Sequence, residues 1–301
     1  RTAPGTSVSN GQTFTLTVNA DNATAHIFDA PIFTSTQTGN QIQTLTSVDK
    51  LTGTAATDDV LNAILNATEV TTKPTMSGVE KVNLTAIAAS IFDAANSTGI
   101  TEIGSVDSNN NLTVRNLAAG ATVVVKSTAA GASTQVQFAN AVAAGTSDVA
   151  TIKVDGVGRG ATAGNTQILN VRGETAGSFE TLNIESTGGA SRFASIGSDS
   201  TVGVGTAPGA ATSLVKTVNV TGTANLRVDN ALLNVTTVDA YSLLPHSAPG
   251  EANEHVFYNM AVAKAVATKV ADDLAKSDPA NADAYRTNAA EIGRASCRER
   301  V

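Results

Sequence analysis

Short runs of alternating apolar and polar residues fill the first 240 residues and constrain the fold more than any other feature. One such run is VATIKVDG (Val149–Gly156), and turns rich in Gly and Asn separate it from its neighbours. A period of two places alternate side chains on opposite faces of an extended strand. The pattern therefore predicts many short β-strands. Similar runs occur at Gln12–Ala20, Asn111–Asn116, Ala121–Ser127 and Thr134–Ala139.

The residues available for a core are small. Aromatic residues make up 4% of the chain and charged residues 15%, and the body is built mainly from Thr, Val, Ala, Asn, Gly and Ser. Val and Thr favour strands because branching at Cβ restricts their rotamers. Side chains of this size fill a core when it consists of many thin layers. The expected fold class is mainly β, with a β-solenoid or stacked β-repeat body and a β-sandwich as the alternative.

One unit recurs at irregular intervals. Its form is apolar-x-x-apolar-Asn-apolar-x, and it occurs at Val79–Thr85, Phe179–Glu185 and Val215–Thr221. The apolar neighbours of each Asn are expected to point into a narrow core. Asn residues at the same place on successive strands are expected to form a ladder of amide hydrogen bonds.

Three segments have a helical pattern. Asp58–Glu69 and Leu84–Gly99 are predicted as helices within the β-region, and Asn253–Ala290 as a helical segment after it. Asp278 and Pro279 are typical of a cap and a first helical residue, so they predict the start of a second helix there. The first of these C-terminal helices carries a stripe expected to be buried, formed by Val262, Val266, Val270 and Leu274.

Charge and motif content exclude several function classes. The formal net charge of −7 disfavours nucleic acid as a partner, and no apolar run reaches the roughly 20 residues of a membrane span. The single cysteine, Cys297, excludes disulfides within the chain. The sequence also lacks the Gly-x-Ser-x-Gly and His-Glu-x-x-His motifs. We therefore predict that the protein is not an enzyme.

The stretch Leu45–Ala63, LTSVDKLTGTAATDDVLNA, resembles the repeat opening of bacterial surface-layer and RTX-type secreted proteins. Together with the strand repeats, the resemblance spans residues 10–240. The matching positions are Asp49, Leu51, Thr52, Gly53, Thr54, Ala55, Asp58, Asn62 and Ala63.

This resemblance implies a structural cell-surface protein, a surface-layer or adhesin-like fragment that self-assembles with the help of calcium outside the bacterial cell. The expected partners are further copies of the chain or a cell-surface polysaccharide. Calcium prefers hard oxygen ligands, and Asp49, Asp58 and Asp59 are the candidate ligands. Their alternative roles are turn former, helix cap and solvated charge. The calcium-binding nonapeptide Gly-Gly-x-Gly-x-Asp of the RTX family does not occur in this sequence.

The segment Glu251–Ala290 resembles a different family, the periplasmic solute-binding proteins of zinc and manganese ABC transporters. The resemblance implies that His255 ligates the metal and that the alternative function is metal-ion transport. Phe257 stands where the family usually has Trp. Zinc takes about four ligands, so His255 alone is an incomplete site. The matching residues are Asn253, Glu254, His255, Val256, Tyr258, Asp278, Pro279, Ala280, Asn281, Ala282, Tyr285, Asn288 and Ala289.

The last segment, Glu291–Val301, has a different origin in our interpretation. DNA that encodes EIGRASCRERV can be written so that it contains AGATCGGAAGAGC, the start of a common sequencing adapter. The expected organisation is therefore a β-repeat fragment at residues 1–240, a helical metal-binding-protein fragment at residues 241–290, and an artefactual tail at residues 291–301. On this interpretation the join near residue 240 is a chimera.

Overall fold

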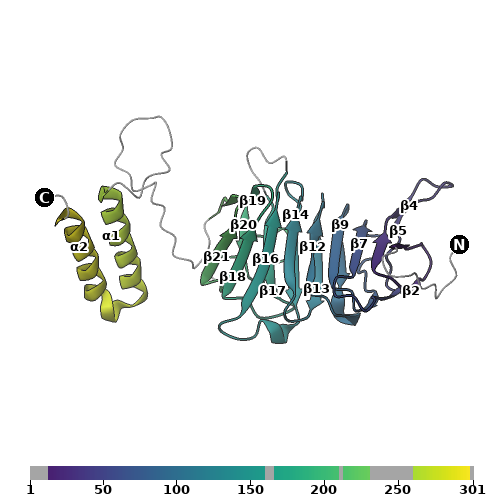
Figure 1. Ribbon diagram of the computed structural model, residues 1–301, viewed down its shortest axis with the longest axis horizontal. Coiled ribbons are helices and arrows are strands. Elements are labelled where there is room, and N and C mark those ends of the chain that lie inside the picture. Colours follow the sequence, from purple (N-terminus) through teal and green to yellow (C-terminus); the bar gives the residue numbers. More distant parts are fainter. Residues whose placement is uncertain (1–12, 160–165, 210–212, 231–259, 299–301) are drawn as a thin grey trace. The chain divides into compact units, whose positions relative to one another are not determined.

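The computed structural model describes residues 13–159, 166–209, 213–230 and 260–298. The chain divides into two compact units, Arg1–Val235 and Thr236–Val301, and each is described by itself. The strands lie in the first unit, where neighbouring strands of the large sheets stand side by side in sequence order (Figure 1). The described part of the second unit, residues 260–298, contains two α-helices.

The largest sheet in the described residues has nine strands, and every neighbouring pair runs parallel. Side chains alternate between the buried core and the outer surface along most of these strands, as the period of two predicts. In order, the strands are β1 (Thr13–Thr15), β3 (Ile27–Ala30), β7 (Val60–Leu65), β9 (Lys81–Ala86), β12 (Glu102–Val106), β14 (Thr122–Lys126), β16 (Val149–Asp155), β18 (Thr181–Ser186) and β21 (Thr217–Gly222).

Four smaller sheets complete the unit as described. The five-stranded sheet is parallel and contains β10 (Ser90–Asp93), β13 (Leu112–Leu117), β15 (Thr134–Phe138), β17 (Ile168–Gly173) and β20 (Ser195–Gly197). The four-stranded sheet is also parallel and contains β11 (Ser97–Thr98), β8 (Thr75–Ser77), β6 (Lys50–Thr52) and β2 (Asn22–Thr24). A parallel pair joins β19 (Ser191–Phe193) to β22 (Leu226–Val228), and an antiparallel pair joins β4 (Ile32–Thr34) to β5 (Gln41–Gln43).

The core lies between the large sheets. From β12 to β18 the chain supplies a strand alternately to the nine-stranded and to the five-stranded sheet. Val123 and Ile152 from the first sheet, and Val136 and Val171 from the second, belong to one buried apolar cluster. The short helical turns η1 (Ala94–Asn96) and η2 (Asn140–Val142) follow β10 and β15.

Asn residues, most of them from the recurring unit, occupy matching places in the nine-stranded sheet. Asn62 pairs in register with Asn83, and Asn183 pairs with Asn219. The Asn83 amide donates to Asn62 Oδ1 at 2.9 Å, and the Asn219 amide donates to Asn183 Oδ1 at 2.8 Å. The bond between Asn183 and Asn219 is the kind expected from the repeat, whereas Asn62 lies outside the recurring unit and adds a second bond that was not predicted.

The sheet arrangement corrects the expected fold class. A β-sandwich is wrong for the large sheets because their neighbouring strands run parallel. The β-solenoid of stacked repeats is corrected to large parallel sheets of nine and five strands, with few helices. Only the nine-stranded sheet extends from β1 to β21, and the smaller sheets cover parts of the unit. The strand-forming runs differ in length and spacing, and the alternation between the same two sheets seen from β12 to β18 does not extend over the whole unit.

Two predicted helices are strands instead. Asp58–Glu69 contains β7, and Leu84–Gly99 contains the end of β9, all of β10, η1 and β11. In β7, Leu61, Ala63 and Leu65 are buried while Asn62 is exposed, which is a period of two. Parallel pairing with β3 and β9 satisfies the backbone of β7, so tertiary pairing overrides its helical pattern.

The second unit is a helical hairpin. Helix α1 (Met260–Ser277) and helix α2 (Ala282–Arg298) are joined by the turn η4 (Pro279–Asn281), so the break falls where Asp278 and Pro279 predicted it. The predicted buried stripe is wrong where the structure describes its side chains, and the side chain of Val262 lies outside that description. Val266 is half-buried, and Val270 and Leu274 are 38% and 44% exposed, whereas Ala271 and Ala275 are buried. Alanine at the buried positions lets the two helix backbones approach closely.

Candidate functional site

Asp49 lies in the turn before β6 and its side chain is fully buried. Its Oδ1 accepts the Asp21 backbone N–H at 2.8 Å, and its Oδ2 accepts the Thr46 backbone N–H at 2.7 Å and the Thr46 hydroxyl at 3.0 Å. Burial raises the pKa of Asp49 to about 6, against the hydrogen bonds from Asp21 and Thr46, which lower it. The carboxylate therefore joins two turns of the chain.

Asp59 precedes β7 and is also fully buried. Its Oδ1 lies 2.6 Å from His26 Nδ1 and accepts the Thr54 hydroxyl at 2.9 Å. No motif surrounds His26 in the sequence, and this contact places it beside a buried carboxylate. Because 33 positions separate His26 from Asp59, no local sequence pattern indicates the pair.

A similar backbone arrangement occurs twice in the nine-stranded sheet. The backbone N–H of Asp59 donates to Glu80 Oε2, and that of Asp148 donates to Glu180 Oε2, each at 2.9 Å. The carbonyl of each Asp in turn accepts the backbone N–H of the same Glu. Glu80 and Glu180 belong to the recurring unit, at the position before the strand. The recurring unit therefore specifies both a strand and, through the Glu before it, the hydrogen bonds that hold the start of that strand.

The expected calcium site is not assembled. Asp58 is exposed, and Asp49 and Asp59 sit on separate turns whose N–H and hydroxyl donors occupy their carboxylate oxygens. Hydrogens therefore stand where a cation would need to lie. In the part of the chain that the structure describes, no three His, Cys, Asp or Glu residues gather as a metal site. The calcium prediction therefore gains no support from the described residues, and Asp49 and Asp59 instead accept hydrogen bonds that stabilise turns.

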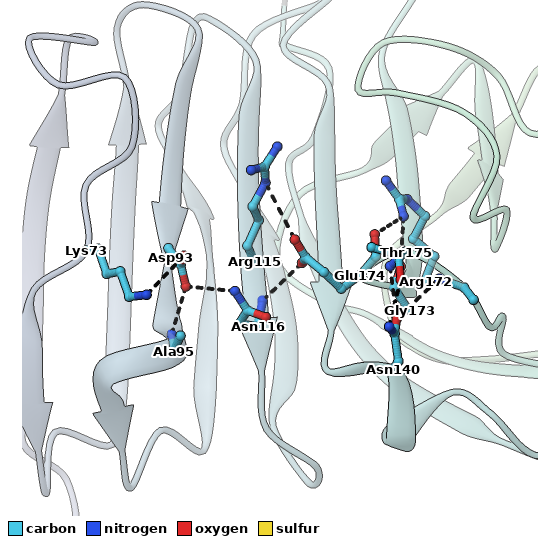
Figure 2. Close-up of polar contacts among 11 residues, drawn as sticks. Lys73, Asp93, Ala95, Arg115, Asn116, Asn140, Arg172, Gly173, Glu174 and Thr175 are labelled. Carbon is cyan, nitrogen blue, oxygen red and sulfur yellow. Dashed lines mark hydrogen bonds and ion pairs between the residues drawn. The ribbon is translucent and has the colours of Figure 1, made fainter.

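A row of polar side chains crosses the five-stranded sheet (Figure 2). Asp93, at the end of β10, accepts the Asn116 amide at 2.9 Å and the Ala95 backbone N–H at 2.9 Å. Lys73 lies 3.8 Å from the same carboxylate. The Asn116 backbone N–H donates to Glu174 Oε2 at 3.3 Å, which carries the row towards β17. These contacts hold the chain in place at the ends of β10, β13 and β17.

Arg172 is the buried member of this row, at 7% exposed. Its Nη1 donates to the carbonyl oxygens of Gly173 and Glu174 at 2.8 and 2.7 Å. Burial lowers the pKa of Arg172, the Glu174 charge raises it, and the nearby Arg115 lowers it. Arg115 Nε also lies 4.0 Å from Glu174 Oε1, so Glu174 balances two cations. The row holds strand ends together and presents no nucleophile paired with a base.

In the helical hairpin, the motif DPANADAY (Asp278–Tyr285) brings its Asp, Asn and Tyr side chains into contact. The Asp278 carboxylate accepts the Asn281 amide at 2.7 Å and the Tyr285 hydroxyl at 2.9 Å. These two hydrogen bonds lower the pKa of Asp278, and the bond to Asp278 raises the pKa of Tyr285. Asp278 therefore ties the turn to α2. The predicted metal ligand His255 lies outside the described residues.

Comparison with known proteins gives one family match. Residues 201–295 match the family described as zinc-uptake complex component A, periplasmic (ZnuA). No curated protein and no solved structure matches the chain. The matched segment contains β21, β22, α1 and most of α2, so it extends beyond the resemblance noted at Glu251–Ala290.

The match supports the expected resemblance of the C-terminal segment to zinc and manganese solute-binding proteins. The surface-layer and RTX-type resemblance expected over residues 10–240 has no support from these comparisons. The origin of Glu291–Val301 and the join near residue 240 stay predictions. The match reaches residue 295, and α2 continues to Arg298. No helix in the described ranges is both long and apolar enough to cross a membrane.

Proposed function

We propose that this chain functions in metal-ion uptake, as part of a solute-binding component that captures zinc or manganese for an ABC transporter. The proposal rests on the match of residues 201–295 to the periplasmic zinc-uptake family. It places the chain on the outer side of the bacterial inner membrane, in the periplasm. The role is binding and delivery of an ion, without chemical conversion of a substrate.

The C-terminal segment supplies one candidate ligand. By family resemblance, His255 binds the ion through a neutral imidazole, which is a common ligand for zinc. In the hairpin that follows, the hydrogen bonds of Asp278 to Asn281 and Tyr285 fix the turn between the two helices. These contacts support a structural role for the motif and leave ion binding to residues before α1.

The number of ligands sets the expected affinity. Zinc sites in proteins have about four ligands, and a site with an open position keeps about three from the protein. Binding that depends on His255 alone is therefore expected to be weak. Neutral imidazole is required, so binding should weaken as the pH falls below about 6.5, the ordinary pKa of histidine.

Equilibrium dialysis against zinc and manganese tests the proposal. We expect the full chain to bind zinc and His255→Ala to lose that binding. His26→Ala is the matched control, because His26 contacts Asp59 in the other unit and should not contribute to zinc binding. Equal zinc binding by the full chain and by His255→Ala would overturn the proposal, as would the absence of binding by either.

A further inference from the structure

A groove of about 440 Å³ crosses the outer surface of the nine-stranded sheet near its N-terminal end. It spans residues of β3, β7 and β9 and the end of β12. This volume is within the range of sites that hold small molecules. We call it the sheet groove, and its lining includes Asp29, Asn62, Ile64, Asn83, Thr85 and Asp107.

A polar row forms one side of the sheet groove. Asn83 donates its side-chain amide to Asn62 Oδ1 at 2.9 Å, and Asn62 donates its amide to Asp29 Oδ1 at 3.1 Å. Asp29, Asn62 and Asn83 are in register on neighbouring parallel strands. Neighbouring strands are about 4.8 Å apart, so the row repeats hydrogen-bonding groups at that interval.

The row retains hydrogen-bonding capacity. An amide nitrogen carries two hydrogens and an amide oxygen accepts two hydrogen bonds. Within the row, Asn62 uses one hydrogen and one acceptor position, and Asp29 Oδ1 accepts the Asn62 amide. Asn62 is exposed and the other two are half-buried, so a ligand can reach the row from solvent. Asn62 and Asn83 can each offer a donor and an acceptor to a hydroxyl group of the ligand, and the Asp29 carboxylate offers acceptors only.

Charge and shape restrict the ligand. Asp29 and Asp107 are the charged residues of the lining, and both are acidic, so an anionic ligand is repelled. Ile64, Val106 and Pro31 add apolar surface along the same groove. The ligand that fits is neutral, rich in hydroxyl groups, partly apolar, and repeated at about 5 Å, close to the strand spacing. A β-1,4-linked oligosaccharide has these properties.

We propose that the sheet groove binds a neutral β-1,4-linked oligosaccharide, whose hydroxyl groups bond to the row of Asp29, Asn62 and Asn83. This site lies in the first unit and is independent of the metal-binding role proposed for residues 201–295. No aromatic residue lines the sheet groove, so ring stacking does not contribute and binding is weak. Specificity for the oligosaccharide comes from the regular spacing of the hydrogen-bonding side chains of Asp29, Asn62 and Asn83.

Side-chain amide NMR spectra, recorded on the full chain during titration with cellotriose or chitotriose, test this proposal. We expect saturable shifts of the Asn62 and Asn83 amide signals. In Asn62→Ala, affinity should fall about fivefold, because one to two hydrogen bonds to the ligand are lost and their partners in the row are disturbed. Trigalacturonate, which is acidic, should cause no such shifts.

Asn183→Ala is the matched control. Asn183 accepts the Asn219 amide in the same sheet, in the same kind of pair, but it does not line the groove. Its replacement should leave oligosaccharide affinity unchanged, and thermal unfolding of both variants checks that each is folded. The proposal is overturned if neither neutral sugar shifts the amides, if Asn183→Ala weakens binding as much as Asn62→Ala, or if trigalacturonate binds equally well.

Discussion

The buried carboxylate of Asp49 makes the stability of this protein depend on pH in an unusual direction. Most carboxylates that accept hydrogen bonds have a lowered pKa, which stabilises the folded state as pH rises. Asp49 accepts two backbone N–H groups and a hydroxyl, yet its burial outweighs them and raises its pKa from 3.8 to about 6. The folded state therefore holds the proton more tightly than the unfolded state.

The sign and size follow from proton linkage. The stabilising contribution of protonated Asp49 is complete below pH 3.8 and is lost as the pH rises to about 6. Each pKa unit is worth about 1.4 kcal/mol, so the loss approaches about 3 kcal/mol at neutral pH. Asp49→Asn cannot ionise, but its amide group would face the Thr46 N–H, and that mismatch costs about 1–3 kcal/mol at every pH.

Urea unfolding of the protein and of Asp49→Asn, measured between pH 4 and pH 7.5, tests the reasoning. At pH 4 the variant should be the less stable protein. The difference in unfolding free energy should then shift by about 2.5 kcal/mol in favour of the variant by pH 7.5, because part of the full effect is already lost at pH 4. A difference that is constant with pH, or one that grows as the pH rises, would refute the claim that burial dominates the pKa of Asp49.

Four further substitutions follow from the structure. Gly53→Ala places a Cβ 1.5 Å from the backbone carbonyl oxygen of Gly78 and should lower the unfolding free energy by about 3 kcal/mol or more in chemical denaturation. Gly203→Ala is its control, because nothing lies within 4 Å of the added Cβ, and it should change the unfolding free energy by less than about 0.5 kcal/mol. Arg172→Leu removes a guanidinium that donates to one buried and one partly buried backbone carbonyl, so thermal and urea unfolding should reveal a loss of about 2–4 kcal/mol. Asp278→Ala removes the acceptor that raises the pKa of Tyr285, so ultraviolet titration should give a lower pKa for that phenol.

Much of the local structure was predictable because it depends on neighbouring residues. The alternation in Ala121–Ser127 and Thr134–Ala139 predicted the strands β14 and β15, and the recurring Asn predicted an amide hydrogen bond of the kind that joins Asn183 to Asn219. The break at Asp278 was also predicted. Each of these signals lies within a few residues of the structure it specifies.

The features that were missed depend on contacts between distant residues. Leu61 and Leu65 fit both a helix and a strand, and only the pairing of β7 with β3 and β9 decides between them. The aspartates of the expected calcium site were judged by residue type, whereas the N–H donors around Asp59 and the approach of His26 are set by the fold. The sheet groove likewise requires the register of three strands, which no single segment encodes.

The most direct test of the proposed function is the imidazole NMR spectrum of the full chain during titration with zinc. The chain has three histidines, and each gives its own signals. If residues 201–295 bind metal as proposed, the His255 signals shift or broaden first, while those of His26, held beside Asp59, do not change. A spectrum in which His255 is unaffected by zinc, or responds no earlier than His26, would contradict a role for this segment in metal uptake.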